Sequence, residues 1–323
     1  MRAPDFWSED NGLARVLAPL GYLWSAGTGL RRAVARTARL SVPVVCVGNL
    51  VAGGAGKTPL AITLGRYLLA RGRAPHFLSR GYGGRARGPL RVDASRHGAH
   101  DVGDEPLLLA AVAPTWVARD RRDGARAAIA GGADIIVMDD GFQNPSLVKD
   151  VSILAVDGGY GFGNGRLMPA GPLRERLAGG LARADAVVVI GSDGRGSRNR
   201  VARHCPVFEA RLEPLPDDAV AGRKVLAFAG IARPAKFYAT LRQLGCIVAG
   251  TRAFPDHHRY RPDEIVRLCE EAAALGALPV TTEKDLVRLP EAARAMVRCV
   301  RVELAWADSA TPGRLLARVL GDG

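Results

Sequence analysis

Aromatic side chains are scarce in this chain, and their scarcity argues against one class of function. Phe, Trp and Tyr make up 6% of the 323 residues, and no run of the sequence interleaves them with arginines. Proteins that bind single-stranded nucleic acid without sequence preference rely on such runs, because bases stack on aromatic rings beside cations. An ATP-dependent nucleic-acid-binding module is therefore disfavoured, although the net charge of +13 first suggests it.

Lysine is also rare, because nearly all the cations are arginine. Ala and Gly are abundant as well, which is typical of a base-composition bias in the genome, so the total charge is weak evidence about partners. A basic surface favours either nucleic acid or an anionic membrane face, and the placement of the cations has to decide between them. The lysines are Lys57, Lys149, Lys224, Lys236 and Lys284.

Cysteine pairs and a secretion signal are absent from the sequence. The five cysteines form no Cys-x-x-Cys motif and are odd in number, and several lie in apolar segments. We therefore expect buried free thiols in a reducing compartment rather than disulfides or a zinc site. The N-terminus lacks a basic start that leads into an apolar core with a cleavage site, so we expect a cytosolic protein.

The most informative segment is residues 42–60, VPVVCVGNLVAGGAGKTPL. An apolar strand, a glycine-rich turn and a helix that opens at Gly-Lys-Thr predict a phosphate-binding loop, in which backbone N–H groups and the helix N-terminus face an anion. Lys57 would reach the β- and γ-phosphates and Thr58 would ligate Mg²⁺. The strict motif has a glycine where this chain has Val51. The alternative is a glycine-rich strand-to-helix turn with an incidental lysine.

A second segment, residues 133–143, supplies carboxylates that could bind Mg²⁺ beside such a phosphate loop. An apolar strand there ends in Asp139 and Asp140. One carboxylate at this position can hold Mg²⁺ directly or through water. Neighbouring side chains alternate in direction on an extended chain, so the two acids cannot share one role.

The N-terminal residues 12–30 are apolar apart from Arg15, and four spaced arginines follow them. Arg15, Pro19 and the glycines argue against a stable transmembrane helix. The segment fits a helix that lies in the membrane interface, with tryptophan and tyrosine at the headgroup level. The alternative is a helical pair that packs on the domain.

The chain length and the alternation of strands and helices predict two α/β/α sandwich domains with mainly parallel sheets, the N-terminal one similar to P-loop NTPases. Residues 213–223 are rich in Pro, Asp and Gly, and we interpret them as a linker. We assign residues 1–40 to the membrane-interface segment, 41–212 to the phosphate-loop domain and 224–323 to a smaller α/β domain. One strand is expected at 298–304 before a last helix.

Seven motifs, in order along nearly the whole chain, resemble those of the tetraacyldisaccharide 4′-kinases of lipid A biosynthesis. The family pattern also lacks the first glycine of the phosphate loop. The motifs are Gly48-Asn49-Leu50 leading to Gly53-Gly54-Ala55-Gly56-Lys57-Thr58-Pro59, then Ser79-Arg80-Gly81-Tyr82-Gly83, Val102-Gly103-Asp104-Glu105-Pro106, Asp139-Asp140-Gly141-Phe142-Gln143, Pro169-Ala170-Gly171-Pro172-Leu173-Arg174-Glu175, Phe254-Pro255-Asp256-His257-His258 and Thr282-Glu283-Lys284-Asp285.

The resemblance implies ATP-dependent phosphorylation of the 4′-hydroxyl of a tetraacylated glucosamine disaccharide 1-phosphate, which gives lipid IVA. It implies ATP and Mg²⁺ as cofactors and a peripheral or monotopic location at the cytoplasmic face of the inner membrane. It implies neither a nucleic-acid partner nor an obligate protein partner. The active site would lie in the cleft between the two domains.

By matching positions, the resemblance also implies roles for single residues. Asp104 and His257 fall on a catalytic dyad, and a carboxylate beside an imidazole suits proton acceptance near neutral pH. Motif position alone favours His257 over His258. Lys57 and Asp139 join the dyad as catalytic residues. The nucleotide site would comprise Gly53, Gly54, Ala55, Gly56, Lys57, Thr58, Arg174 and Glu175, and the metal site Thr58, Asp139 and Asp140.

A rival interpretation is a P-loop kinase or GTPase that acts on a soluble metabolite, since the loop and the acids alone permit it. The segment 282–285 has glutamate between threonine and lysine, so it does not match the Asn/Thr-Lys-x-Asp motif that reads guanine. Guanine specificity is therefore disfavoured.

Overall fold

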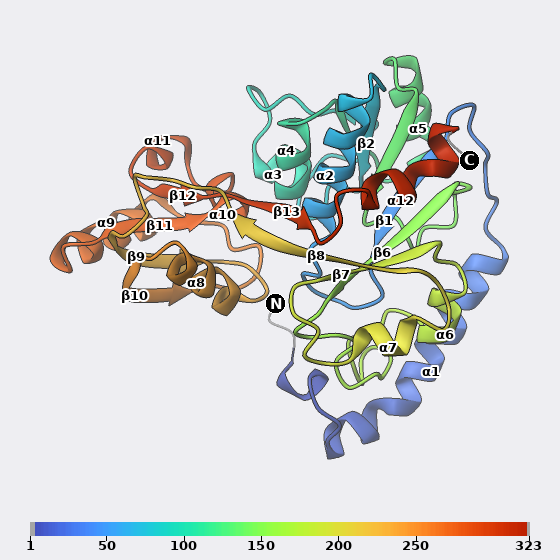
Figure 1. The fold of residues 1–323 in the computed structure, drawn as a ribbon, viewed down its shortest axis with the longest axis horizontal. Helices are drawn as coiled ribbons and strands as arrows, with labels where there is room; N and C mark the ends of the chain where they lie inside the picture. Colours follow the sequence, from blue (N-terminus) through green and yellow to red (C-terminus); the bar gives the residue numbers. More distant parts are fainter. Residues whose placement is uncertain (1–3, 322–323) are drawn as a thin grey trace.

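A computed structural model describes residues 4–321 and shows a larger and a smaller lobe (Figure 1). The larger lobe is built on a nine-stranded sheet with the order β13-β8-β7-β6-β1-β5-β2-β4-β3. Its pairs are parallel except for β13 with β8 and β3 with β4. These strands are β1 (Val44–Gly48), β2 (Pro75–Ser79), β3 (Leu90–Arg91), β4 (Thr115–Val117), β5 (Ile135–Asp139), β6 (Val151–Asp157), β7 (Ala186–Ile190), β8 (Val207–Pro214) and β13 (Val302–Trp306).

The central strands are apolar throughout because both faces of the sheet are covered. Alternate residues of β1 separate to the two faces, so that Val45 and Val47 join one core cluster while Val44 and Cys46 join the other. Helices and connecting segments supply the opposing side chains of both clusters. The helices of this lobe are α2 (Lys57–Ala70), α3 (Ala99–Val102), α4 (Asp104–Ala110), α5 (Arg121–Ala130), α6 (Leu177–Leu181), α7 (Ser197–Val201) and α12 (Thr311–Leu320).

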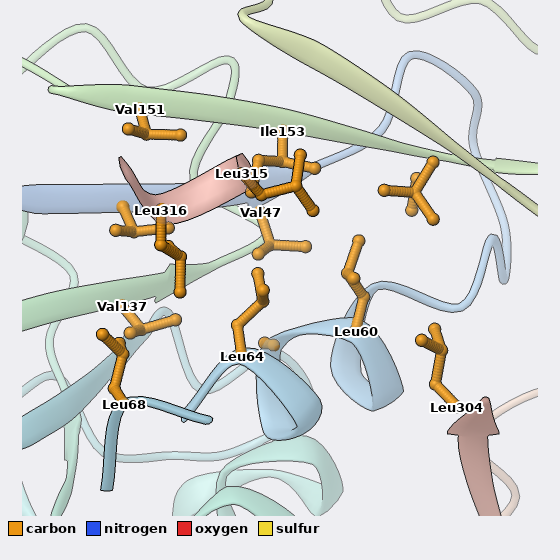
Figure 2. Packing of buried hydrophobic residues seen from close by; sticks show 14 of the residues in the cluster. Val47, Leu60, Leu64, Leu68, Val137, Val151, Ile153, Leu304, Leu315 and Leu316 are labelled. Atoms are coloured by element: carbon orange, nitrogen blue, oxygen red, sulfur yellow. The ribbon is translucent and has the colours of Figure 1, made fainter. Parts of the chain in front are cut away.

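The face that carries the phosphate-loop helix is covered jointly by α2 and α12. Figure 2 shows Leu64 and Leu68 of α2 below Val47 and Val137, with Leu315 and Leu316 of α12 on the same cluster. Their apolar burial contributes about 1.5–3 kcal/mol for each fully buried leucine. The first and the last parts of the chain therefore stabilise the same core.

The smaller lobe is a four-stranded parallel sheet with the order β10-β9-β11-β12. Val225 and Ala227 face one cluster with α8, and Leu226 and Phe228 face the other with α9. Its elements are β9 (Lys224–Ala229), α8 (Pro234–Gln243), β10 (Ile247–Ala253), α9 (Pro262–Ala274), β11 (Leu278–Thr282), α10 (Glu283–Leu286), α11 (Glu291–Arg294) and β12 (Arg298–Val300).

The strand expected at 298–304 is wrong as a single element. It divides at Arg301 into β12, which pairs with β11 of the smaller lobe, and β13, which pairs with β8 of the larger lobe. The boundary expected for the second domain, 224–323, is therefore also wrong in its last part, because β13 and α12 belong to the larger lobe. Residues 322–323 lie outside the described residues.

The segment expected to be a linker, 213–223, begins inside β8 and continues as a turn. Two strands, β8 and β13, thus run between the lobes (Figure 1). The Leu215 N–H donates to the carbonyl of Arg301 at 3.0 Å, which extends their ladder toward the smaller lobe. The lobes are therefore connected by two hydrogen-bonded antiparallel strands rather than by a single flexible linker.

The N-terminal segment forms a short 3₁₀ helix, η1 (Asp5–Trp7), and a long helix, α1 (Gly12–Ala33), on the outside of the larger lobe (Figure 1). The Asn11 side chain caps α1 by accepting the Ala14 N–H at 3.0 Å. Only Ala14 and Gly21 of this helix are buried. Within the described residues, no helix is both long enough and apolar enough to span a membrane. Residues 1–3 of the expected 1–40 segment lie outside the described residues.

The five thiols are free, as the sequence predicts, but only Cys46 and Cys246 are buried, and Cys205, Cys269 and Cys299 are partly buried. Burial raises the pKa of Cys46 to about 11 and that of Cys299 to about 12. Buried thiols with raised pKa values are poor nucleophiles, so these cysteines serve packing.

Candidate functional site

The phosphate loop connects β1 to α2 and faces a cavity of about 1340 Å³ that residues of both lobes line. Gly53 and Gly56 take φ angles of +114° and +81°, which side chains with a Cβ rarely adopt. A Cβ on Gly56 would also lie 2.7 Å from Cδ1 of Ile190. The glycines thus let the chain turn tightly and start α2 at Lys57, with the first N–H groups of the helix open toward the cavity.

Asp139 ends β5 beside this loop, because β5 pairs directly with β1. The Thr58 hydroxyl donates to Oδ2 of Asp139 at 2.8 Å. The other oxygen, Oδ1, is buried and has no hydrogen-bond partner. Burial and the nearby Glu105 charge raise the pKa of Asp139 to about 7. A buried carboxylate oxygen without a partner, next to a hydroxyl, suits a divalent cation with oxygen ligands.

Asp140 has a different environment from Asp139. Its φ of +54° turns the chain sharply after β5, so its side chain points to the cations of the cleft. Oδ1 accepts a hydrogen bond from Nη1 of Arg174 at 2.8 Å and lies 3.8 Å from Nζ of Lys57. Burial alone would raise the pKa of Asp140, but the charges of Lys57 and Arg174 outweigh it and hold the pKa below its ordinary value. The pKa values of the two acids are therefore shifted in opposite directions, and their side chains meet different partners.

Across the cleft, Asp104 meets His257 from the smaller lobe. Nδ1 of His257 lies 3.1 Å from Oδ2 of Asp104, which begins helix α4 and is almost fully buried. Burial acts to raise the pKa of Asp104, but the hydrogen bond from His257 and the charges of Lys284 and Arg288 hold it well below the ordinary range. The carboxylate is thus ionised at neutral pH and fixes the orientation of the imidazole.

His257 is positioned by its own strained backbone as well as by Asp104. Its φ is +57°, and its N–H donates to the carbonyl of Gly230 at 3.0 Å. The Tyr82 ring packs edge-on against the imidazole at 5.2 Å between centroids. His258 points elsewhere, stacks on Phe254 and lies 3.2 Å from Oε2 of Glu264. Of the two histidines, His257, which motif position favours, is therefore the one in contact with Asp104.

Two cations at this junction were not singled out by the sequence as site residues. Nε of Arg288 donates to Oδ2 of Asp104 at 2.8 Å, and Nζ of Lys284 donates to Oε1 of Glu105 at 2.8 Å. Arg288 also contacts Asp285 through Nη1 at 3.0 Å. Lys284 belongs to a motif in the sequence, but Arg288 follows that motif without any recognisable local pattern. Both cations join the smaller lobe to the acids of the larger one.

Glu175 lies behind the lining of the cleft, next to Arg32 and Gln143, which line it, and its expected role at the nucleotide stays a prediction. Glu175 is buried, does not line the cleft and contacts Arg32 of α1 at 2.9 Å and Nε2 of Gln143 at 3.2 Å. Arg183 donates to it as well. The carboxylate therefore ties α1 to the larger lobe, whereas its neighbour Arg174 does line the cleft.

The remaining expected site residues surround one volume, except Asp104, which is buried outside the cleft lining and contacts His257. The cleft is lined by the loop residues Gly53, Gly54, Ala55, Gly56, Lys57 and Thr58, by Asp139, Asp140 and Arg174, and from the smaller lobe by His257. No group of three or more His, Cys, Asp or Glu side chains suited to a metal ion occurs between residues 4 and 321. A cation held by Asp139 and Thr58 would therefore complete its shell with water and substrate oxygens.

A family model described as tetraacyldisaccharide-1-P 4′-kinase, LpxK, matches residues 13–320. The chain belongs to this family. Two proteins named tetraacyldisaccharide 4′-kinase support the assignment. The one from Rhodospirillum centenum is 54% identical, over 99% of this chain and 97% of its own length. The one from Paramagnetospirillum magneticum is 56% identical, over 95% of each chain.

The fold agrees with a solved structure of the 4′-kinase family. The crystal structure of LpxK from Aquifex aeolicus in complex with ATP superimposes with a TM-score of 0.73 at 27% identity, over 95% of this chain and 99% of that one. The predicted α/β fold, the 4′-kinase family and the kinase class are therefore confirmed. The roles of single residues in the site stay predictions.

Proposed function

We propose that this chain transfers the γ-phosphate of ATP to the 4′-hydroxyl of a tetraacylated glucosamine disaccharide 1-phosphate, which yields lipid IVA. The observation that carries the proposal is the cleft that the phosphate loop and Asp139 of one lobe line together with His257 of the other, which contacts the buried Asp104. Phosphoryl transfer requires positioning, neutralisation of charge and a group that takes the hydroxyl proton, and this cleft offers all three. The ATP-bound LpxK relative supports ATP as the donor.

The phosphate loop binds the nucleotide in this proposal. The loop N–H groups and Lys57 hold the β- and γ-phosphates, and Arg174, fixed by Asp140, faces the same space. Asp139 and Thr58 would hold Mg²⁺ through the free Oδ1 of Asp139 and the Thr58 hydroxyl. Bound there, Mg²⁺ neutralises phosphate charge and makes the γ-phosphorus a better electrophile.

Asp104 and His257 act together on the acceptor. The 4′-hydroxyl must lose its proton as its oxygen attacks phosphorus, and the contact of 3.1 Å lets carboxylate and imidazole share that proton as one unit. Arg288 and Lys284 keep Asp104 ionised before the reaction. Because His257 belongs to the smaller lobe, the lobes must stay in contact during transfer.

The substrate and the site of phosphorylation are tested with purified protein, ATP, Mg²⁺ and detergent-dispersed tetraacyldisaccharide 1-phosphate. We expect a product heavier by one phosphate, and no product from an acceptor that lacks the 4′-hydroxyl but is otherwise identical. Phosphorylation of the 4′-deoxy acceptor, or transfer to a soluble sugar at equal rate, would contradict the proposal.

Helix α1 brings the enzyme to the membrane in this account, at the cytoplasmic face of the inner membrane. Leu20 and Leu23 are 49% and 70% exposed and share a face with exposed Val16, opposite the buried Ala14 and Gly21. Removing acyl chains from a bilayer costs about 0.8 kcal/mol per CH₂, so the enzyme must reach its substrate at the surface. An apolar helix face followed by arginines suits an anionic leaflet, at about 1 kcal/mol per arginine.

The membrane role is tested by replacing Val16, Leu20 and Leu23 with serine. Trp24 is left intact because its Nε1 donates to the carbonyl of Arg174 at 3.0 Å, next to the nucleotide site. We expect weaker sedimentation with anionic vesicles and a higher KM for vesicle-borne acceptor, with KM for ATP unchanged. The matched control replaces Ile247, Val266 and Met296, which are similarly exposed apolar residues of the smaller lobe. Equal loss of vesicle binding in both variants would refute the role of α1.

A further inference from the structure

A second charged contact joins the lobes on the other side of the phosphate loop from Asp104. Asp157 ends β6, which pairs with β1 on the side opposite β5. Its Oδ2 lies 2.8 Å from Nη1 of Arg233 and also accepts a hydrogen bond from Lys236, both from the smaller lobe. Its Oδ1 accepts the N–H groups of Gly159 and Tyr160, at 3.0 and 3.2 Å. The carboxylate is thus fixed by its own loop and presents one oxygen to two cations.

Arg233 also touches the phosphate loop itself. Its Nη2 donates to the carbonyl of Gly54 at 3.3 Å, and its guanidinium lies 4.5 Å from the centroid of the Tyr160 ring. A Cβ on Gly54 would lie 3.8 Å from Cβ of Ala232, so the smaller lobe reaches the loop at this point. The Arg233 guanidinium thus contacts Asp157, Gly54 and Tyr160, all of which belong to the larger lobe.

The local charge leaves one cation in excess. Asp157 is almost fully buried and can neutralise only one of the two side chains, whereas Arg233 and Lys236 both line the cleft. If the Arg233 guanidinium turns from Asp157 to a phosphate oxygen, Lys236 still pairs the carboxylate, so no buried charge is left unpaired. The planar guanidinium fork also matches two phosphate oxygens at once.

We propose that Arg233 is a catalytic arginine supplied by the smaller lobe to the phosphate chain of the nucleotide held in the loop. This inference rests on the proposed kinase function. It corresponds to an arginine finger within one chain, which stabilises the charge that develops on the transferred phosphoryl group. Because the same lobe carries His257, one closure of the lobes delivers both the proton acceptor and the cation.

Two variants test the proposal in the transfer assay. Arg233→Ala should lower kcat by about 10²- to 10³-fold, the usual cost of removing one group that stabilises transition-state charge. Arg242→Ala, which removes an exposed arginine of α8 outside the cleft lining, is the control and should lower kcat by less than about threefold. Millimolar guanidinium ion should restore part of the kcat of Arg233→Ala, because it can refill the position beside the phosphates but cannot link the lobes.

Four results would overturn the proposal or separate it from the function itself. If Arg233→Ala is as active as Arg242→Ala, or if its loss is not relieved by guanidinium, Arg233 does not act on the phosphates and the proposal is wrong. If the parent protein phosphorylates no disaccharide, the proposed function fails, and calorimetric titration then decides the role of Arg233 alone. In that titration Arg233→Ala should weaken binding of a non-hydrolysable ATP analogue about tenfold relative to ADP, and an unchanged ratio overturns the role.

Discussion

Asp139 and Asp140 are adjacent in sequence but their pKa values shift in opposite directions, because one is buried beside a hydroxyl and the other faces two cations. The sequence singled out both acids and predicted that they cannot share one role, since neighbours on a strand point in opposite directions. It did not predict that Glu175 would pair with Arg32 and Arg183 inside the larger lobe, because a motif position carries no information about which buried partner a carboxylate meets.

The first prediction concerns Lys57 and Asp139, the two residues expected to neutralise phosphate charge directly or through Mg²⁺. Lys57→Ala and Asp139→Ala should each lower kcat by about 10²-fold or more, since each removes a group that stabilises or helps neutralise the transferred phosphate. Steady-state phosphate transfer measures the loss. Lys224→Ala and Asp123→Ala, which change the same residue types at exposed positions outside the cleft, are the controls. A kcat near that of the parent for either site variant would remove that residue from the mechanism.

At the scale of elements, the sequence predicted the buried parallel strands well. A short, continuous apolar segment between turn residues is typical of a strand that is covered on both faces of its sheet. The prediction failed at residues 298–304, where one segment of mixed polar and apolar residues is divided between two sheets. No local pattern marks the change of sheet at Arg301. The partner of β13 is β8, whose pairing depends on the arrangement of the whole larger lobe.

The second prediction follows from this change of sheet. Leu316 of α12 is fully buried in the core of the larger lobe, although it lies near the C-terminus. Leu316→Ala should cost about 2–5 kcal/mol of unfolding free energy. Hydrogen exchange should rise in β1 and β6 rather than in β9. The matched change Leu268→Ala, in α9 of the smaller lobe, should show the reverse pattern. Increased exchange in β9 with Leu316→Ala would contradict the assignment of α12.

At the scale of the whole molecule, the order of motifs predicted a shared cleft, but not the contacts that hold it. The two residues in the Arg288–Asp104 pair are separated by 184 positions in the chain, and Arg233 reaches Gly54 across 179. Such pairs form only when the two lobes, each built on its own sheet, have folded and packed against each other. Arg288 and Arg233 are therefore visible as bridges in the structure but have no signature in the sequence, whereas Asp104, His257 and Lys284 lie in motifs.

The central claim is that both lobes together form one phosphoryl-transfer site, and the Asp104–His257 contact tests it most directly. The measurement is single-turnover transfer from [γ-³²P]ATP to the disaccharide 1-phosphate by the parent, Asp104→Asn, His257→Ala and the double variant, each checked for folding by thermal unfolding. We expect each single change to lower the rate by about 10²- to 10⁴-fold and the double variant to be little slower than the worse single one, because groups that act as a unit are not additive. Losses that multiply in the double variant would mean that the two residues act independently, and rates near that of the parent in both single variants would contradict the account.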